Sequence, residues 1–237
     1  MDTARKTLLA SGLVATAGCL WGLYWVPVRA LSGAGWPGAL GSVIIALIAG
    51  TLLVPVIMAR RFAWRSADRV GVLATAVGGS AFMLYSVGIV EARVAIVILL
   101  FYLTPVWTTL ITRFVFGHAV HPIRYGVIVL GLFGLFLTLG RGGFLPRPER
   151  AGEWYALLAG LFWSLGSIGI SARSDLPAVE STFVFVIGAL ATALILFGLD
   201  PTLPTTDVWP PALSSVAWAV AAGAVWWIAS MIALVWA

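Results

Sequence analysis

Charged residues are scarce in this chain. Lys, Arg, Asp and Glu together make up 10% of its 237 residues, against about 25% in soluble domains. Its single cysteine, Cys19, excludes a disulfide framework within one chain. The two histidines and few acids show no metal-ligand spacing, and neither a glycine-rich phosphate loop nor a nucleophile motif occurs. We therefore expect no cofactor and no enzymatic activity.

Apolar residues, by contrast, fill 61% of the chain and gather in long runs. A helix needs about 20 apolar residues to cross the hydrocarbon core of a membrane. Eight segments qualify or nearly do so: about 8–28, 37–59, 70–90, 94–116, 124–140, 153–172, 181–199 and 214–237. Because a backbone in lipid must satisfy its own hydrogen bonds, these segments predict an all-α integral membrane protein, a multi-span helical bundle. The first run is too long for a signal peptide, so we expect it to be retained.

The sequence also repeats itself, at an offset of 142 positions that places Trp21 on Trp163. The loop between the second and third apolar blocks changes sign between the two copies. Residues 60–69 carry four Arg and one Asp, whereas the matching residues 200–211 carry two Asp and no basic residue. Since arginine-rich loops stay on the cytoplasmic side, the second copy is predicted to be inserted the other way round. Inverted repeats of this kind are typical of secondary transporters.

The distribution of basic residues predicts the orientation of the chain. With the N-terminus inside, nine Lys and Arg residues fall on the inner side and five on the outer side. This bias favours a cytoplasmic N-terminus in a multi-pass membrane protein. The net charge of +5 arises from these short loops and does not indicate nucleic-acid binding. The expected partners are the lipid bilayer and a small-molecule substrate, while the oligomeric state stays open.

The repeat divides the chain into two predicted units. Residues 1–141 form a first repeat of five helices, and residues 142–237 form a second, inverted repeat with three. The second repeat lacks counterparts of the fourth and fifth helices. The sequence stops at Ala237 inside an apolar run without a charged flank, where interfacial anchors usually lie. We expect a truncated product, and the alternative is an eight-helix protein with a blunt end.

One segment carries a family resemblance. Residues 97–117 read VILLFYLTPVWTTLITRFVFG, which resembles the fourth helix of EamA-type transporters in the drug/metabolite transporter superfamily, with its Leu-Thr-Pro-Val core. Trp21 and Trp163, each followed by a small residue, resemble the tryptophan-small pair in the first helix of each repeat of that family. The resemblance implies ten helices in two inverted repeats, of which eight are present here. It also implies export of a small metabolite such as an amino acid, by alternating access, across a bacterial inner membrane. The chain departs from the family at His118, where relatives often have Glu.

A transporter of this kind needs a central cavity near the bilayer midplane. The candidate lining residues are polar or aromatic and lie at mid-span: Trp21, Tyr24, Ser80, Tyr85, Tyr102, Thr104, Trp107 and Trp163. Aromatic side chains offer apolar area with a polar tip, and they stack on cations or rings. The alternative for each is helix packing or contact with lipid. Pro105 is expected to kink the fourth helix, either as a gating hinge or as a fixed bend.

Charge within the membrane usually marks ion coupling, and the predicted spans carry almost none. Proton coupling would then depend on Glu91, His118, the substrate itself or the missing helices. The alternative for Glu91 is an interfacial ion pair with Arg93. We therefore expect facilitated export or exchange of a neutral or zwitterionic metabolite. Gly131 and Gly134 share a helix face, which predicts contact with another helix.

Other functions stay open at this point. A multidrug-type exporter of aromatic cations would need an acidic residue facing the cavity, and none is visible at mid-span. A membrane-embedded enzyme would need convergent catalytic groups, which are lacking. A non-transporting assembly subunit is a further alternative, because a partner could supply the two helices that the second repeat lacks.

Overall fold

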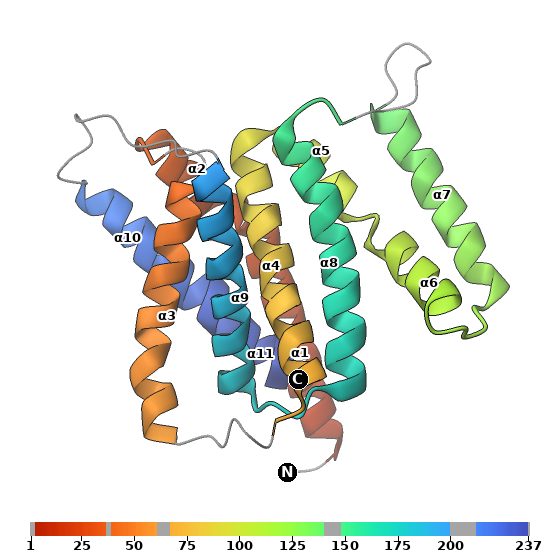
Figure 1. The fold of residues 1–237 in the computed structure, drawn as a ribbon, viewed down its shortest axis with the longest axis horizontal. Coiled ribbons are helices and arrows are strands. Elements are labelled where there is room, and N and C mark those ends of the chain that lie inside the picture. The colour runs from red at the N-terminus through yellow and green to blue at the C-terminus, as the bar shows by residue number, and fades with distance from the viewer. Residues whose placement is uncertain (1–2, 37–38, 61–66, 140–147, 200–211, 237) are drawn as a thin grey trace.

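The computed structural model describes residues 3–36, 39–60, 67–139, 148–199 and 212–236. Every described element is a helix; α3, α4, α8 and α9 run roughly parallel or antiparallel to one another, whereas α6 and α10 lie oblique to them (Figure 1). In chain order they are α1 (Thr3–Leu23), α2 (Trp25–Gly33), α3 (Leu40–Arg60), α4 (Arg69–Glu91), α5 (Val94–Phe101), α6 (Thr104–Phe114), α7 (Pro122–Leu139), α8 (Ala151–Arg173), α9 (Ala178–Leu199), α10 (Leu213–Ala221), the π-helix η3 (Ala222–Ala229) and α11 (Ser230–Trp236). The all-α prediction is confirmed.

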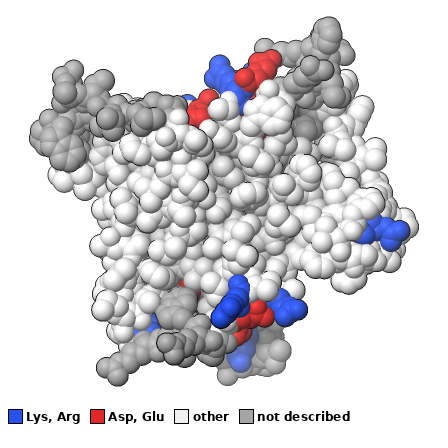
Figure 2. All heavy atoms as spheres, in the orientation of Figure 1, with Lys and Arg blue, Asp and Glu red and all other residues white. Residues whose placement is uncertain are grey.

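Seven stretches of the described chain are long and apolar enough to cross a membrane: Arg5–Gly33, Leu40–Arg60, Arg69–Glu91, Val94–Phe114, Ala151–Arg173, Ala178–Leu199 and Leu213–Trp236. They match seven of the eight predicted segments, with ends that differ by a few residues. The remaining predicted segment, 124–140, forms α7, which contains the shorter apolar helix Pro122–Gly134. Figure 2 shows the matching charge pattern on one face, where charged residues gather at the two ends and a broad, almost uncharged band lies between them.

Helix α4 forms the centre of the bundle, where it packs against α8 and α9. The helices approach closely because glycines face one another. A Cβ atom added to Gly88 would lie 2.8 Å from the carbonyl oxygen of Gly152, and one added to Gly152 would lie 2.8 Å from that of Gly88. In lipid such small-residue contacts replace the hydrophobic effect as the source of helix association. This tight centre holds the elements that carry the candidate site.

Helix α7 lies at the edge of the bundle, next to α6 (Figure 1). The prediction that Gly131 and Gly134 pack against a helix is wrong for the described chain, since a Cβ atom on either would meet nothing within 4 Å. Sequence spacing shows which residues share a face, but it does not show whether another helix covers that face.

Two spans are broken next to a proline. In the first, the backbone N–H of Tyr24 donates to Trp21 rather than to Leu20, and Pro27 follows within the first turn of α2. The chain then continues as α2 to Gly33, well beyond the predicted end near residue 28. In the second, the chain turns at Tyr102 between α5 and α6. A proline that lacks its N–H cannot complete the helical ladder, so each break lies where that bond is lost.

Candidate functional site

Phe82 on α4 forms the centre of an aromatic cluster. Its ring centroid lies 4.8 Å from that of Tyr24, 5.3 Å from Trp21 and 5.2 Å from Trp227. Phe185 on α9 adds a further ring at 5.8 Å. Tilted and edge-to-face pairs at these separations attract each other beyond their buried area. The cluster therefore joins four of the spans at one point inside the bundle.

A chain of hydroxyl groups lies beside these rings. The Tyr24 hydroxyl shares a hydrogen bond of 3.0 Å with Ser86, and Ser86 shares one of 2.8 Å with Ser42 on α3. The indole N–H of Trp227 donates to the same tyrosine oxygen at 2.9 Å. All four side chains are buried. Because each group has a partner, the polar atoms are stabilised without any charge.

Trp21 and Trp163, paired by the sequence repeat, are in contact. Their ring centroids are 5.2 Å apart, with an interplanar angle of 79°. The indole N–H of Trp21 donates to Ser230 on α11 at 2.9 Å, and Trp163 lies 6.4 Å from Phe101.

The break at Tyr24 also leaves the Leu20 carbonyl without its helical donor, and the indole of Trp226 donates to it at 2.7 Å.

The break between α5 and α6 has its own set of hydroxyl contacts. Pro105 has no N–H for the Phe101 carbonyl, and the Thr104 hydroxyl donates to that oxygen instead, at 2.6 Å. The Thr104 carbonyl in turn accepts from Thr108 at 2.9 Å and from Ser164 on α8 at 3.1 Å. These bonds attach α6 to α8 at the break.

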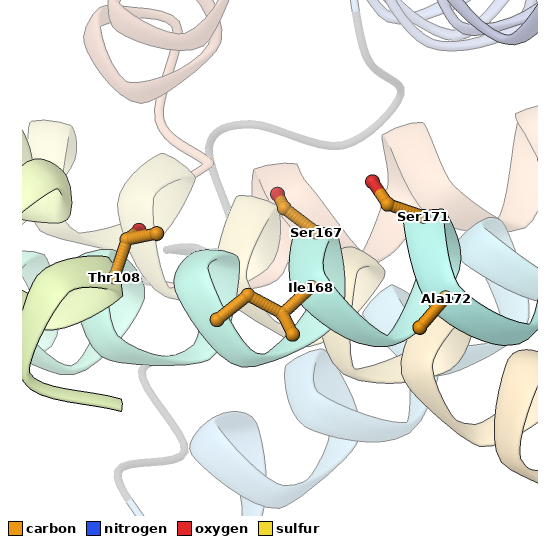
Figure 3. Close-up of a pocket in the computed structure, with 5 residues that line it drawn as sticks. All are labelled: Thr108, Ser167, Ile168, Ser171 and Ala172. Carbon is orange, nitrogen blue, oxygen red and sulfur yellow. The ribbon is translucent and has the colours of Figure 1, made fainter. Parts of the chain in front are cut away.

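A groove of about 410 Å³ lies between α6 and α8, lined by Thr108, Ser167, Ile168, Ser171 and Ala172. Figure 3 shows the hydroxyls of Ser167 and Ser171, one turn apart on α8, pointing the same way. None of these residues is among the predicted lining residues. The groove is distinct from the aromatic cluster, since the two share no residue.

The structure brings together five of the predicted lining residues. Trp21, Tyr24, Tyr85 and Trp163 meet around Phe82 and Phe101, and Thr104 adjoins them through Phe101. Tyr85, for example, lies 4.9 Å from Phe101.

The other predicted lining residues lie apart from the rings of that cluster. Ser80 donates to Ala76 and to Gly188 on α9, which is a helix-packing contact. Tyr102 is 70% exposed at the break. Trp107 packs over Gly160, and its buried indole nitrogen has no hydrogen-bond partner among the described residues.

Pro105, Glu91 and His118 lie outside the cluster. Pro105 lies in the first turn of α6, just after the break, rather than in the middle of a continuous helix. Glu91 is the last residue of α4. His118 is exposed between α6 and α7, and its ring is stacked against Phe116 at 6.2 Å.

Sequence reasoning missed a buried acid. Glu180 lies in the first turn of α9 with 1% of its surface exposed, and its Oε1 accepts from Arg60 Nε at 2.7 Å. The expectation of almost no charge in the spans was wrong at this point because the seventh segment was started at residue 181, and α9 begins at Ala178. The acidic residue at the start of an apolar run was the available signal. The sequence gives no comparable signal for Ser42 and Ser86.

A second charged contact lies at the same end of the bundle. Asp68 caps α4 by accepting from the backbone N–H groups of Val70 at 2.7 Å and Gly71 at 3.4 Å. Arg173 at the end of α8 lies 3.5 Å from the other carboxylate oxygen of Asp68. The Val70 bond first, and then the Gly71 bond and Arg173, lower the pKa of Asp68 below its ordinary value. The opposite charge pattern of residues 200–211 lies outside the described residues, and so do residues 61–66 of the matching loop.

Within the described residues, no group of three or more His, Cys, Asp or Glu side chains could hold a metal ion. The central cluster consists of rings, hydroxyls and indole N–H groups. Such a set can stack on and hydrogen-bond a small molecule.

Comparison with known proteins places the chain in a family. Residues 8–140 match the EamA-like transporter family. A solved structure described as "Crystal structure of protein" shares the fold, with a TM-score of 0.57 and 22% identity over 95% of this chain and 78% of that one. No curated protein matches the chain. The match of the family over more than half of the sequence, on a multi-pass helical bundle, shows that the chain belongs to the EamA-like transporter family, membrane transporters of the drug/metabolite transporter superfamily.

Proposed function

We propose that this protein is a secondary transporter that exports a small metabolite, such as an amino acid, by alternating access around the central aromatic cluster. The observation that carries the proposal is the contact between Trp21 and Trp163, at 5.2 Å. These residues belong to the two halves related by the sequence repeat. A group that touches both halves can bind substrate while the halves move relative to each other.

The helix contacts support a division into two inverted repeats, residues 1–141 and 142–237. At the offset of 142, the span Leu213–Trp236 corresponds to α4. Helix α4 packs on α8 and α9, and the Leu213–Trp236 span packs on the first span and α3, which are the counterparts of α8 and α9. The first span and α8 also run in opposite directions (Figure 1).

The chemistry of the cluster favours a neutral or zwitterionic substrate with an apolar or aromatic part. Tyr24, Ser42, Ser86 and Trp227 supply uncharged donors and acceptors, and Phe82 supplies a ring face. Tyr24 is fully buried, so its hydroxyl reaches a substrate only after the helices move apart. The basic residues at the N-terminal end of the bundle support a cytoplasmic N-terminus. The bacterial inner membrane is part of the proposal through the family resemblance alone.

The test is ligand binding followed by exchange. A ligand that binds the folded protein raises its Tm, so purified protein is screened against neutral amino acids and aromatic cations. A hit is then followed by radiolabelled exchange in proteoliposomes. Trp21→Ala and Trp163→Ala should abolish both the Tm shift and exchange. Trp154→Ala, which removes an indole that is 54% exposed on α8, is the matched control and should retain both.

The outcomes separate the alternatives. If only aromatic cations bind, the protein is a multidrug-type exporter rather than a metabolite exporter. If a ligand binds but no exchange follows, the assembly-subunit alternative is favoured. If both tryptophan variants exchange at the wild-type rate, the cluster serves packing and the proposal is wrong.

A further inference from the structure

The two residues of the ion pair between Arg60 and Glu180 differ in their exposure to solvent. The Glu180 side chain is 2% exposed, whereas that of Arg60 is 47% exposed. One bond of 2.7 Å, from Arg60 Nε to Oε1, holds the pair together. The second carboxylate oxygen, Oε2, is buried and has no hydrogen-bond partner among the described residues, and the same holds for the neighbouring Ser181 hydroxyl. Among the described residues, the carboxylate of Glu180 thus has a single partner, Arg60, which water can reach.

Burial of an unpaired polar oxygen is costly, and more so when the group carries charge. A proton on Oε2 removes that charge. The guanidinium loses little when the pair separates, because its exposed half stays hydrated. Two arrangements therefore compete: an ionised Glu180 paired with Arg60, and a neutral Glu180 with a hydrated Arg60.

We propose that Glu180 is a proton-binding site of the transporter. Its protonation breaks the ion pair between α3 and α9 and lets the N-terminal end of the bundle open. In the step, a hydronium ion on that side gives up a proton: its O–H bond breaks, an O–H bond forms at Oε2, and a water molecule is released. The charge-assisted bond from Arg60 becomes a weaker bond to a neutral acid. The proton returns to water when the ion pair re-forms. The proposal rests on the proposed transport function and names its coupling ion.

The position of the pair explains why it would control opening. Arg60 is the last residue of α3, and Glu180 lies in the first turn of α9, so the bond joins the two halves of the chain. At the offset of 142, Arg60 corresponds to Thr202 and Glu180 to Gly38, which cannot form an ion pair. The ion pair therefore has no counterpart at the repeat-related positions. Because binding and conformational change are linked reciprocally, a proton that loosens this end is itself bound more tightly when the end is open.

Other charged groups at this end are few in the described chain. Next to α9, α4 contributes Asp68 and Arg69, and α8 with the connection that follows it contributes Arg173 and Asp175. Asp68 and Arg173 pair with each other, and Asp175 accepts from the backbone N–H of Asp68. Helix α11, which also packs against α9, has no charged residue. Arg60 is thus the described cation that contacts Glu180.

The first measurement is infrared difference spectroscopy of the full chain in lipid nanodiscs, titrated from about pH 8 to about pH 4. A carbonyl band of a protonated, buried carboxylic acid should appear in the wild type and be absent in Glu180→Gln. It should remain in the control Glu149→Gln, which removes an exposed acid at the other end of the bundle. In Arg60→Gln the band should appear at a higher pH, because the cation no longer favours the ionised form.

The second measurement follows opening. Spin labels at Ala59→Cys on α3 and Ala172→Cys on α8, both exposed, are placed in a Cys19→Ser background. The distance between them should lengthen in the wild type as the pH falls. It should be long at every pH in Glu180→Gln, and Glu149→Gln should respond like the wild type.

Each result decides the proposal. Glu180 is not the proton site if the carbonyl band persists in Glu180→Gln. The same conclusion follows if the band appears at the same pH in Arg60→Gln as in the wild type. If the band belongs to Glu180 but the distance between the spin labels does not change with pH, protonation of Glu180 does not open this end of the bundle. Should Glu180→Gln fail to fold, the Arg60→Gln titration still tests the site. Neither measurement uses a transported substrate, so a failed export assay would leave both results standing.

Discussion

The first span and α8 are mates under the 142-position repeat, yet one is broken and the other is continuous. At the positions of Tyr24 and Pro27 in the first span, α8 has Gly166 and Gly169. Gly166 lets α8 lie against α4, since a Cβ atom there would be 2.9 Å from the backbone nitrogen of Gly78. Tyr24 instead ends α1 and reaches Ser86 through its hydroxyl. At these two positions a continuous helix that packs closely on α4 thus differs from a broken helix that carries the polar part of the site.

The same contrast appears nearly two turns earlier in each helix. Gly160 on α8 faces the Phe101 carbonyl, with a Cβ distance of 3.2 Å, whereas its mate Gly18 would meet nothing within 4 Å. Equivalent small residues therefore have different roles in the two halves. Helix α8 uses them to hold α4, α5 and α6, and the described part of the chain places no helix over Gly18.

The largest expected effect breaks the packing side of this comparison. Gly166→Ala forces α4 and α8 apart and should lower the free energy of unfolding by about 1–3 kcal/mol. Gly18→Ala on the open face should be neutral or stabilising, by up to about 1 kcal/mol, because alanine favours helix. Unfolding in detergent, followed by intrinsic tryptophan fluorescence, measures both. Equal losses in the two variants would contradict the contrast.

The next effect concerns the polar side. Tyr24→Phe keeps the ring against Phe82 but removes the oxygen that Ser86 and Trp227 share. Ser86 keeps its bond to Ser42, but the buried indole N–H of Trp227 is left without a partner, which should cost about 1–3 kcal/mol. Tyr102→Phe, at a side chain that is 70% exposed, is the matched control and should change the stability little. A Tyr24→Phe protein as stable as the control would mean that the hydroxyl chain contributes nothing to folding.

These residues also show how far sequence reasoning reaches. Composition and run length suffice to predict the helices, because a backbone in lipid has few other structures. The repeat offset picks out Trp21 and Trp163 as candidate lining residues, because it compares whole helices rather than single residues, and the structure shows the two rings in contact. Ser42 and Ser86 could not be found, because they become a pair only when α3 and α4 meet. Glu180 was missed because a carboxylate at the start of an apolar run is ordinarily placed in water.

A third prediction sharpens the role of the break. Pro27→Ala restores a backbone N–H for the Leu23 carbonyl and makes the first span more like α8. Stability should change by less than about 1 kcal/mol, because the added bond is offset by the greater freedom of the unfolded chain. The rate of substrate exchange should nevertheless fall if the break moves during transport. An unchanged exchange rate in proteoliposomes would show that the break is a fixed feature.

The smallest effect lies at the starts of the two central helices. Helix α4 has the carboxylate cap Asp68, whereas α8 starts after Arg150 with no side-chain cap. The folded pKa of Asp68 is lowered from its ordinary value of 3.8, so its carboxylate stabilises the fold above about pH 4, and this contribution is lost as the pH falls through the lowered pKa. Asp68→Ala should therefore lower the Tm at neutral pH and converge with the wild type in acid. Asp68→Asn, which still accepts the Val70 bond, should retain most of the stability and lose this acid dependence. If the Tm of Asp68→Ala stays below that of the wild type by the same amount from neutral to acid pH, the ionised cap of Asp68 is not what stabilises the start of α4.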